Sequence, residues 1–550
     1  MATPITTESE NVEQILPFSL EEESFYIWIT DLYTKDGLEA LQLLSHTLNS
    51  LQRIEIPASL RSLFIEKISI LVFQLSKQLQ KTYAKSYFPF SSHDSLKVKL
   101  SANCALGIAD NYTLLCQDTL FETRDLFSLQ QKALILVTAI QALANVLFYR
   151  AMLYEKPGKG FWAQCFLLYL LAKKNEVLDL SCNHQNTSFL KVFKPLLVFE
   201  LSHVQQYNTE EIQVVYKVLN NLSEKIELLP LIPGKKMDSV PYINLRLDKP
   251  PSVADLNGSE PSPHLFYISN INLIKQLFEF FAHKKNITYS NKIIALRLIK
   301  TLTMNQRRRG ERKLAENELF SEIGFDRFNQ YLLHKENVAK SEEIVSFETR
   351  NLSLDAQLKK QNREKLFGFR NEQEASLSLA WRPEDNTVEY IENTDIWSEK
   401  IEKTSDKEEA KKNATVIDQS NFGFCIGIKD KNPATKVGEI IHLLIPPASV
   451  VTVVRRIVSA DKYDVIAGVE VLGYDAELLH MPDSEHKDMR TAFILSDIDG
   501  RESIVIKADD YHGEEYLYAT RNDESLRYRV EKTLNSSTST IKHLKVSLAV

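Results

Sequence analysis

The chain changes character at Asp418-Gln-Ser-Asn-Phe-Gly-Phe-Cys-Ile-Gly-Ile428. The sequence before this stretch is charged and helix-like, whereas apolar residues after it alternate with period two, which predicts strands. Asp418, Ser420 and Gly423 stand at the start of such a strand and offer a carboxylate acceptor, a hydroxyl group and exposed backbone. Such a set can read the polar edge of a planar base, provided that a positive group elsewhere holds the rest of the ligand.

A positive cluster lies far upstream, in Gln306-Arg-Arg-Arg-Gly-Glu-Arg-Lys313. Within it, Arg308 and Arg312 have the spacing R-x-x-x-R, while the downstream stretch has the spacing D-x-S-x-x-G. Each pattern alone is common, because cations gather at helix ends and Asp, Ser and Gly gather in turns between strands. The two patterns in this order, followed by strands, are more specific than either one.

Together the two patterns resemble the signatures of the PilZ domain, a small bacterial β-barrel that binds cyclic di-GMP. The resemblance is strongest over 416–472, where the sequence resembles the barrel of a family of larger proteins. In that family a helical region precedes the barrel and a β-rich tail follows it. The supporting runs are Lys436-Val-Gly-Glu-Ile-Ile, Thr452-Val-Val-Arg-Arg-Ile and Ala467-Gly-Val-Glu-Val-Leu, with a weaker likeness over 154–180.

The resemblance implies a set of ligand-binding residues for cyclic di-GMP. The arginines would engage phosphates and guanine faces, because guanidinium groups make planar, bidentate and stackable contacts. The aspartate would accept from guanine N–H groups, the serine would bond nearby, and the glycine would let the strand approach without a side-chain clash. The implied site residues are Arg307, Arg308, Arg312, Asp418, Ser420 and Gly423, with Arg309 as an alternative to Arg307.

The pattern of apolar residues predicts helices before the arginine cluster and strands after it. Between the two motifs, 315–333 predicts a strand followed by a short helix over 325–333. The later predicted strands are 415–417, 422–428, 439–445, 450–457, 465–472, 491–495, 503–508, 516–520, 526–530 and 540–548.

We therefore expect an α+β multidomain protein. An N-terminal all-α array or bundle precedes a C-terminal six-stranded-type PilZ β-barrel, which carries a further β-rich extension. The predicted segments are a disordered N-terminus (1–16), an α-helical domain (17–229), a Pro-rich linker (230–265), helices leading to the barrel (266–304), the arginine motif and first barrel elements (305–333), a charged and partly disordered insertion (334–413), the barrel (414–480) and the β-rich extension (481–550).

Composition narrows the function further. The formal net charge of -7 and the absence of aromatics among the arginines argue against binding of a nucleic acid polymer. Five cysteines without a C-x-x-C pair, and a polar, acidic start, predict a cytoplasmic location. The most apolar run, 133–147, falls short of a bilayer span and predicts a buried helix rather than membrane insertion.

No catalytic motif is visible, so the sequence predicts a protein that is not an enzyme and needs no cofactor or metal. His442 in particular is interpreted as a strand residue, because no second ligand stands at metal spacing. The main hypothesis is a bacterial cyclic di-GMP receptor whose helical region gives the output and contacts a protein partner. The alternative is an interaction scaffold whose degenerate barrel binds a protein of motility or pilus machinery instead of the nucleotide.

Overall fold

A computed structural model gives the fold. It describes residues 16–83, 88–117, 126–182, 187–230, 239–254, 262–283, 289–303, 313–343, 413–420, 423–429, 435–445, 448–459, 463–482, 490–497, 499–521, 524–534, 538 and 540–549. The chain divides into two compact units, Met1–Arg307 and Arg308–Val550, which we call the helical unit and the β unit. Most of the two segments predicted as disordered, 1–16 and 334–413, lies outside the described residues.

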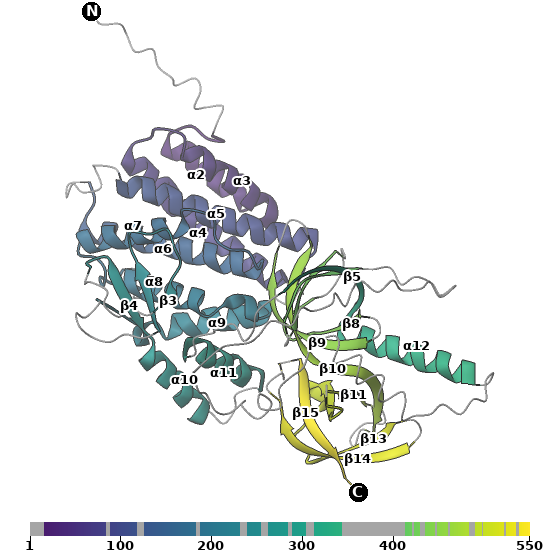
Figure 1. Cartoon of the computed structure of the whole chain (residues 1–550). Coiled ribbons are helices and arrows are strands. Elements are labelled where there is room, and N and C mark those ends of the chain that lie inside the picture. The colour runs from purple at the N-terminus through teal and green to yellow at the C-terminus, as the bar shows by residue number, and fades with distance from the viewer. Residues whose placement is uncertain are drawn as a thin grey trace, which may run out of the picture. The chain divides into compact units, whose positions relative to one another are not determined.

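The helical unit is built around a long central helix, α5, which packs against α3, α4 and α6 (Figure 1). Gly107 of α5 permits this packing, because a Cβ there would lie 2.9 Å from the Cβ of Leu48 in α3. The helices are α2 (Glu22–Leu32), α3 (Gly37–Leu51), α4 (Ala58–Tyr83), α5 (Ser92–Gln117), α6 (Leu129–Met152), α7 (Phe161–Lys174), α8 (Phe189–Leu201), α9 (Thr209–Asn221), α10 (Ile271–His283) and α11 (Tyr289–Thr303), with short 3-10 helices at Val204–Gln206 and Ser223–Lys225.

Helix α6 contains the most apolar run of the sequence. By length and composition alone it is able to cross a membrane, but 78% of its most apolar window is buried inside the helical unit. Its N-terminus is closed by a capping box, in which Ser128 and Gln131 satisfy each other's backbone N–H groups. The predicted buried helix is confirmed, and the burial is that of a core helix.

The Pro-rich segment predicted as a linker contributes strands to a four-stranded antiparallel sheet. The strands are β1 (Glu227–Pro230), β2 (Val240–Asn244), β3 (Ser252–Ala254) and β4 (Leu265–Ser269), in the order β1-β4-β2-β3. Pro230 ends β1, and Pro241 stands where β2 pairs with β3 but not yet with β4, so neither proline removes a required ladder bond. The strands are short and their prolines hide the alternation, which is why the sequence suggested a linker.

The β unit consists of two rings of antiparallel strands that share one strand. The first ring runs β5-β6-β7-β10-β9-β8 and returns to β5, and the second runs β10-β11-β12-β15-β14-β13 and returns to β10. The strands are β5 (Lys313–Ile323), β6 (Ala414–Ser420), β7 (Gly423–Ile428), β8 (Ile440–Ile445), β9 (Ala448–Val458), β10 (Val465–Met481), β11 (Arg490–Ser496), β12 (Glu502–Lys507), β13 (Tyr516–Arg521), β14 (Glu524–Thr533) and β15 (Ile541–Leu548), with a 3-10 helix at Ala508–Asp510.

Strand β10 is longer than predicted because it belongs to both rings. Its first half pairs with β7 and β9, and its second half pairs with β11 and, at one position, with β13. Register shifts on both sides of Gly473 mark bulges, which bend a strand and increase its twist. A side chain at Gly473 would meet Leu495 of β11, so the bend brings the two strands into close contact. The predicted boundary at 480/481 therefore falls inside a continuous strand.

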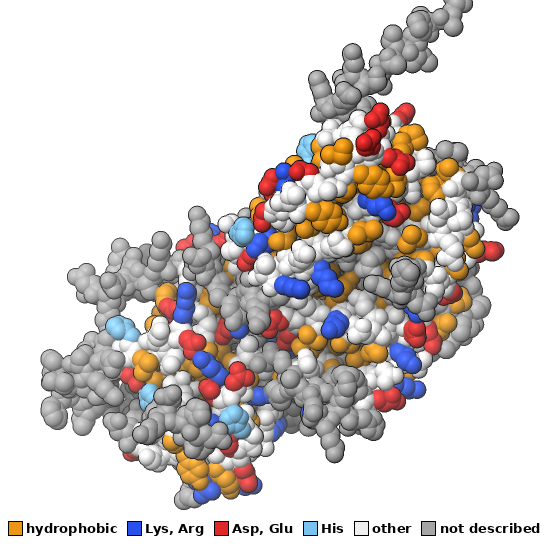
Figure 2. Space-filling view, turned by 180° about the vertical axis from the view of Figure 1, so that it is seen from behind, with side chains coloured by type: hydrophobic (Ala, Val, Ile, Leu, Met, Phe, Trp, Pro, Cys, Tyr) orange, Lys and Arg blue, Asp and Glu red, His pale blue; other side chains and the backbone are white. Residues whose placement is uncertain are grey.

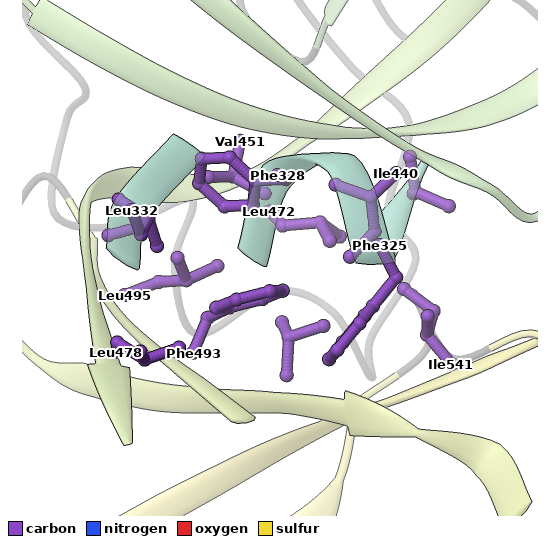
Figure 3. Packing of buried hydrophobic residues seen from close by; sticks show 13 residues of the cluster. Phe325, Phe328, Leu332, Ile440, Val451, Leu472, Leu478, Phe493, Leu495 and Ile541 are labelled. Atoms are coloured by element: carbon purple, nitrogen blue, oxygen red, sulfur yellow. The ribbon is translucent and has the colours of Figure 1, made fainter. Parts of the chain in front are cut away.

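Helix α12 (Phe325–Glu343) joins the two rings through a shared core. Figure 3 shows Phe325, Phe328 and Leu332 of this helix pointing into the cluster. The strand residues around them come from both rings and are Ile440, Val451, Val453, Leu472, Ala476, Leu478, Phe493, Leu495, Val505 and Ile541. The predicted strand and helix over 315–333 are confirmed, and the helix continues ten residues beyond the predicted end at Leu333, to Glu343. The predicted fold class, an α+β chain with N-terminal helices and a C-terminal β region, is confirmed.

Candidate functional site

The predicted arginines Arg307, Arg308 and Arg312 lie outside the described residues. The structure does describe the elements that flank them, since α11 ends at Thr303 and β5 begins at Lys313. Lys313 pairs with Gln419 of β6, and the next residue of β5 pairs with Asp418. The arginine cluster therefore leads directly into the strand that lies beside the D-x-S-x-x-G motif, although a long segment separates the two motifs in the sequence.

Asp418, Ser420 and Gly423 lie together in the β6–β7 hairpin. Asp418 pairs with Cys425, and Ser420 pairs with Gly423. The hydroxyl group of Ser420 donates to the carbonyl oxygen of Gly423 at 3.2 Å, which closes the end of the hairpin. Because residues directly opposite each other in a sheet project to the same face, these four residues share one face.

Gly423 is required by the approach of a neighbouring strand. A Cβ at this position would overlap the carbonyl oxygen of Val469 in β10 and lie 3.1 Å from the Cα of Glu470. Those atoms belong to the backbone and cannot turn aside, so a larger residue would push β7 and β10 apart. The expected role of this glycine, to let a strand approach, thus has a structural reason that involves no ligand.

The strand register extends this face across four strands in two rows. One row, which we call the Asp418 row, contains Asp418 (β6), Cys425 (β7), Gly468 (β10) and Arg456 (β9). The neighbouring row, the Ser420 row, contains Ser420 (β6), Gly423 (β7) and Glu470 (β10). The residue that pairs with Glu470 in β9, Val453, is fully buried in the core around α12.

The polar residues of these rows identify the outer face of the first ring. The opposite face carries Phe424, Ile426, Ala467 and Val469, which pair with one another across β7 and β10 and are buried. An apolar set of this kind fills the interior of a small barrel, because charged groups there would be unpaired and desolvated. The Asp418 row and the Ser420 row are therefore on the outside of the first ring.

A bulge in β9 turns two arginines toward the outer face. Arg456 pairs with Gly468, and Val454 pairs with the next residue of β10, so that Arg455 is the extra residue. Arg455 donates to the carboxylate of Glu470 at 2.5 Å. Arg456 is exposed, and its side chain lies over Gly468: a Cβ on that glycine would be 2.7 Å from the Cγ and Nε atoms of Arg456.

An aromatic ring and a lysine flank the outer face farther along β7. A Cβ at Gly427 would lie 2.6 Å from the ring of Tyr463, so the ring rests directly on the glycine backbone. The ammonium group of Lys429 stands 5.6 Å from the centre of the same ring, within the range of a cation–π contact. The outer face thus has a floor of small residues with positive groups on one side and Asp418 and Ser420 on the other.

Sequence reasoning missed Arg455, Arg456 and Glu470 as members of this face. All three lie in runs that carry the resemblance, but their convergence depends on the pairing of β9 with β10 and on the bulge. The adjacent Arg455 and Arg456 were the signal that the sequence offered. Strict alternation would turn one of two adjacent residues into the apolar interior, so two arginines in a row indicate a bulge. Leu314, which pairs with Asp418 on the other side, was missed for the same reason and is 89% exposed.

His442 is confirmed as a strand residue, in β8, and it is fully buried beneath α12. Its ring stacks on Phe328 with the ring centres 4.6 Å apart, and its Nε2 atom lies 2.8 Å from the hydroxyl group of Ser449. Burial lowers the pKa of His442 to about 4, so the imidazole is neutral. Within the described ranges, no three His, Cys, Asp or Glu side chains are grouped so that they could hold a metal ion.

Comparison with known proteins bears on the helical unit. Residues 23–233, from the start of α2 to just beyond β1, match the family described as "Cyclic-di-GMP receptor FimW, N-terminal domain". Neither a curated protein nor a solved structure matches the chain significantly. The match covers less than half of the chain, and it makes the helical unit similar to the N-terminal domain of a cyclic di-GMP receptor.

Proposed function

We propose that the protein binds cyclic di-GMP on the outer face of the first ring, which acts as a PilZ-type barrel. The observation that carries this proposal is the pairing of Lys313 with Gln419. Lys313 follows the arginine cluster directly in the sequence, which supports one site formed by the cluster and the D-x-S-x-x-G motif. The long segment between the motifs is therefore compatible with one site, since β5 and β6 remain neighbours.

The chemistry of the outer face fits a cyclic dinucleotide of guanine. Arg308 and Arg312, with Arg307 beside them, supply the guanidinium groups that bind phosphates in a bidentate way. Asp418 accepts from the N–H groups of a guanine edge, and Ser420 adds a hydroxyl group. The side chain of Leu314 is exposed, and Gly423 and Gly427 of β7 have no side chains that protrude. A flat base can therefore lie against this surface.

Binding at this position would act on the connection between the two units. Helix α11 is anchored in the helical unit, because Arg297 donates to both carboxylate oxygens of the buried Glu211 in α9, at 3.0 and 3.1 Å. The arginine cluster begins a few residues after α11 and ends at β5. By this proposal, the ligand holds the cluster against the first ring and so restricts the link, which changes the output of the helical unit.

The remaining parts of the proposal concern partners and location. The helical unit exposes large apolar side chains, among them Tyr26 and Ile27 of α2 and Tyr33 directly after it, and Figure 2 shows such side chains spread between charged ones on one face of the molecule. Exposed apolar residues of this kind suit a protein partner. We propose a cytoplasmic, non-enzymatic receptor that needs no cofactor and passes the signal to such a partner.

Calorimetric titration of cyclic di-GMP into the purified protein tests the proposal. We expect binding in the micromolar range or tighter, its loss in the variants Arg308→Ala/Arg312→Ala and Asp418→Ala, and unchanged binding in Arg501→Ala. Arg501 is a suitable control because it is an exposed arginine beside Asp499, outside the first ring. A well-folded wild type that gives no heat would overturn the proposal and favour the scaffold interpretation.

A further inference from the structure

We propose that Arg456 is a third ligand-binding arginine and that it determines the preference for guanine. The inference rests on the proposed function and adds a residue that neither sequence motif contains. Arg456 and Asp418 stand at opposite ends of the Asp418 row. With about 4.8 Å between neighbouring strands, the three steps of this row separate their backbones by about 14 Å.

The side chain of Arg456 crosses part of this distance. It lies over Gly468 of the neighbouring strand, with its Cγ, Cδ and Nε atoms at 2.7 to 3.2 Å from where a Cβ would stand. Any other residue at 468 would displace it. The sequence thus combines an arginine on β9 with a glycine opposite it on β10, so that the arginine extends over the sheet instead of away from it.

The two adjacent arginines of β9 differ in their partners. Arg455 is paired with Glu470, so its charge is already compensated by a carboxylate. Arg456 is exposed and has no ion pair or hydrogen bond with any residue in the described part of the chain. Of the two, Arg456 is the one whose five donors are available to a ligand.

The chemistry of guanine assigns a role to this arginine. Asp418 accepts from the N–H groups of a guanine edge but cannot contact the O6 and N7 acceptors, which need a donor. A guanidinium group donates to O6 and N7 of guanine in a bidentate way, and this contact rejects adenine, which presents an amino group in place of O6. We assign this contact to Arg456, because its side chain extends over Gly468 toward the rest of the Asp418 row.

The test compares cyclic di-GMP with cyclic di-AMP in titrations of wild type, Arg456→Ala, Arg456→Lys and Gly468→Ala. A bidentate contact to guanine discriminates between bases by roughly tenfold to a hundredfold. We expect Arg456→Ala to weaken cyclic di-GMP binding by about that factor and to reduce the ratio of the two affinities. Arg456→Lys should restore only part of the loss, because an ammonium group is not bidentate. Gly468→Ala, which displaces the side chain but keeps its charge, should also reduce the ratio.

The outcomes separate this inference from the proposed function. If the wild type binds cyclic di-GMP, the R-x-x-x-R variant loses binding and Arg456→Ala stays within twofold of wild type, the inference is overturned and the proposed function stands. An equal loss of affinity for both dinucleotides in Arg456→Ala also overturns it, because the residue would then not read the base. A folded wild type that binds neither ligand overturns both.

Discussion

Replacing Phe328 by alanine should detach α12 from both rings. Phe328 is fully buried, with its ring centre 4.6 Å from that of His442 in the first ring and 4.8 Å from that of Phe493 in the second. Truncation of a buried phenylalanine costs about 3–5 kcal/mol, since apolar contacts are lost and a cavity remains. We expect the upper part of this range, because the strands on both sides are held by their ladders and cannot collapse into the space.

Hydrogen exchange followed by mass spectrometry measures this loss where it occurs. The tryptophans that the structure describes, Trp28 and Trp162, both lie in the helical unit, so their fluorescence does not report on the rings. Each 1.4 kcal/mol of lost protection raises exchange about tenfold, so a loss of about 4–5 kcal/mol should make amides of β8, β9 and β11 exchange roughly a thousandfold faster or more.

Two leucine variants provide a matched comparison for this prediction. Leu332→Ala removes a buried side chain of α12 and should cost about 2–5 kcal/mol, whereas Leu548, which is 56% exposed, should tolerate the same change within about 0.5 kcal/mol. The reasoning is refuted if Phe328→Ala and Leu332→Ala change exchange in the rings by no more than Leu548→Ala does.

Three further perturbations should have measurable effects. Gly423→Ala should lower the free energy of unfolding of the β unit by more than about 1 kcal/mol, because the added Cβ overlaps the backbone of β10. The free energy of unfolding of the β unit should fall as the pH drops from about 6.5 to 4. Burial lowers the pKa of His442 to about 4, so the unfolded chain binds more protons than the folded chain in this range. The loss that this histidine causes is about 3 kcal/mol when complete. Arg297→Met should lower the free energy of unfolding of the helical unit by about 3–5 kcal/mol, because it leaves the carboxylate of Glu211, which is 3% exposed, without its cation.

Each of these expectations has its own check. For the glycine, Gly158→Ala is the comparison, since no atom lies within 4 Å of a Cβ there, and equal losses in urea unfolding would contradict the steric argument. For the histidine, His442→Gln should show a shallower decline between pH 6.5 and 4, and an identical pH profile would assign the decline to other groups. For the arginine, Lys191→Met breaks an exposed ion pair and should cost less than about 1 kcal/mol in tryptophan-monitored unfolding. A loss in Lys191→Met as large as that in Arg297→Met would contradict the prediction that the burial of Glu211 makes its ion pair the more important one.

The strands of the β unit could be predicted because alternation is strong wherever one face is buried. Phe424, Ile426 and Ile428 show this in β7, where all three are buried. Strand β10 was predicted only as far as Leu472, because the bulges around Gly473 shift the phase of the alternation. A bulge is a feature of pairing between strands, and the sequence of one strand does not contain it.

The candidate site could be predicted only in part, for a related reason. Asp418, Ser420 and Gly423 are close in sequence, and a hairpin brings them together. Arg456 joins their face only through the register of β10 with its neighbours on both sides. Local periodicity fixes which face of a strand a residue occupies, but it does not fix which residues of distant strands stand beside it.

Hydrogen exchange with and without cyclic di-GMP shows where on the protein the ligand binds. We expect slower exchange on ligand addition in peptides covering 413–429 and 463–471, and no change in β13 and β14 of the second ring. Because the family match lies in the helical unit, ligand binding there is the competing result. Protection confined to 16–303, with the β6–β7 hairpin unchanged, would contradict the account.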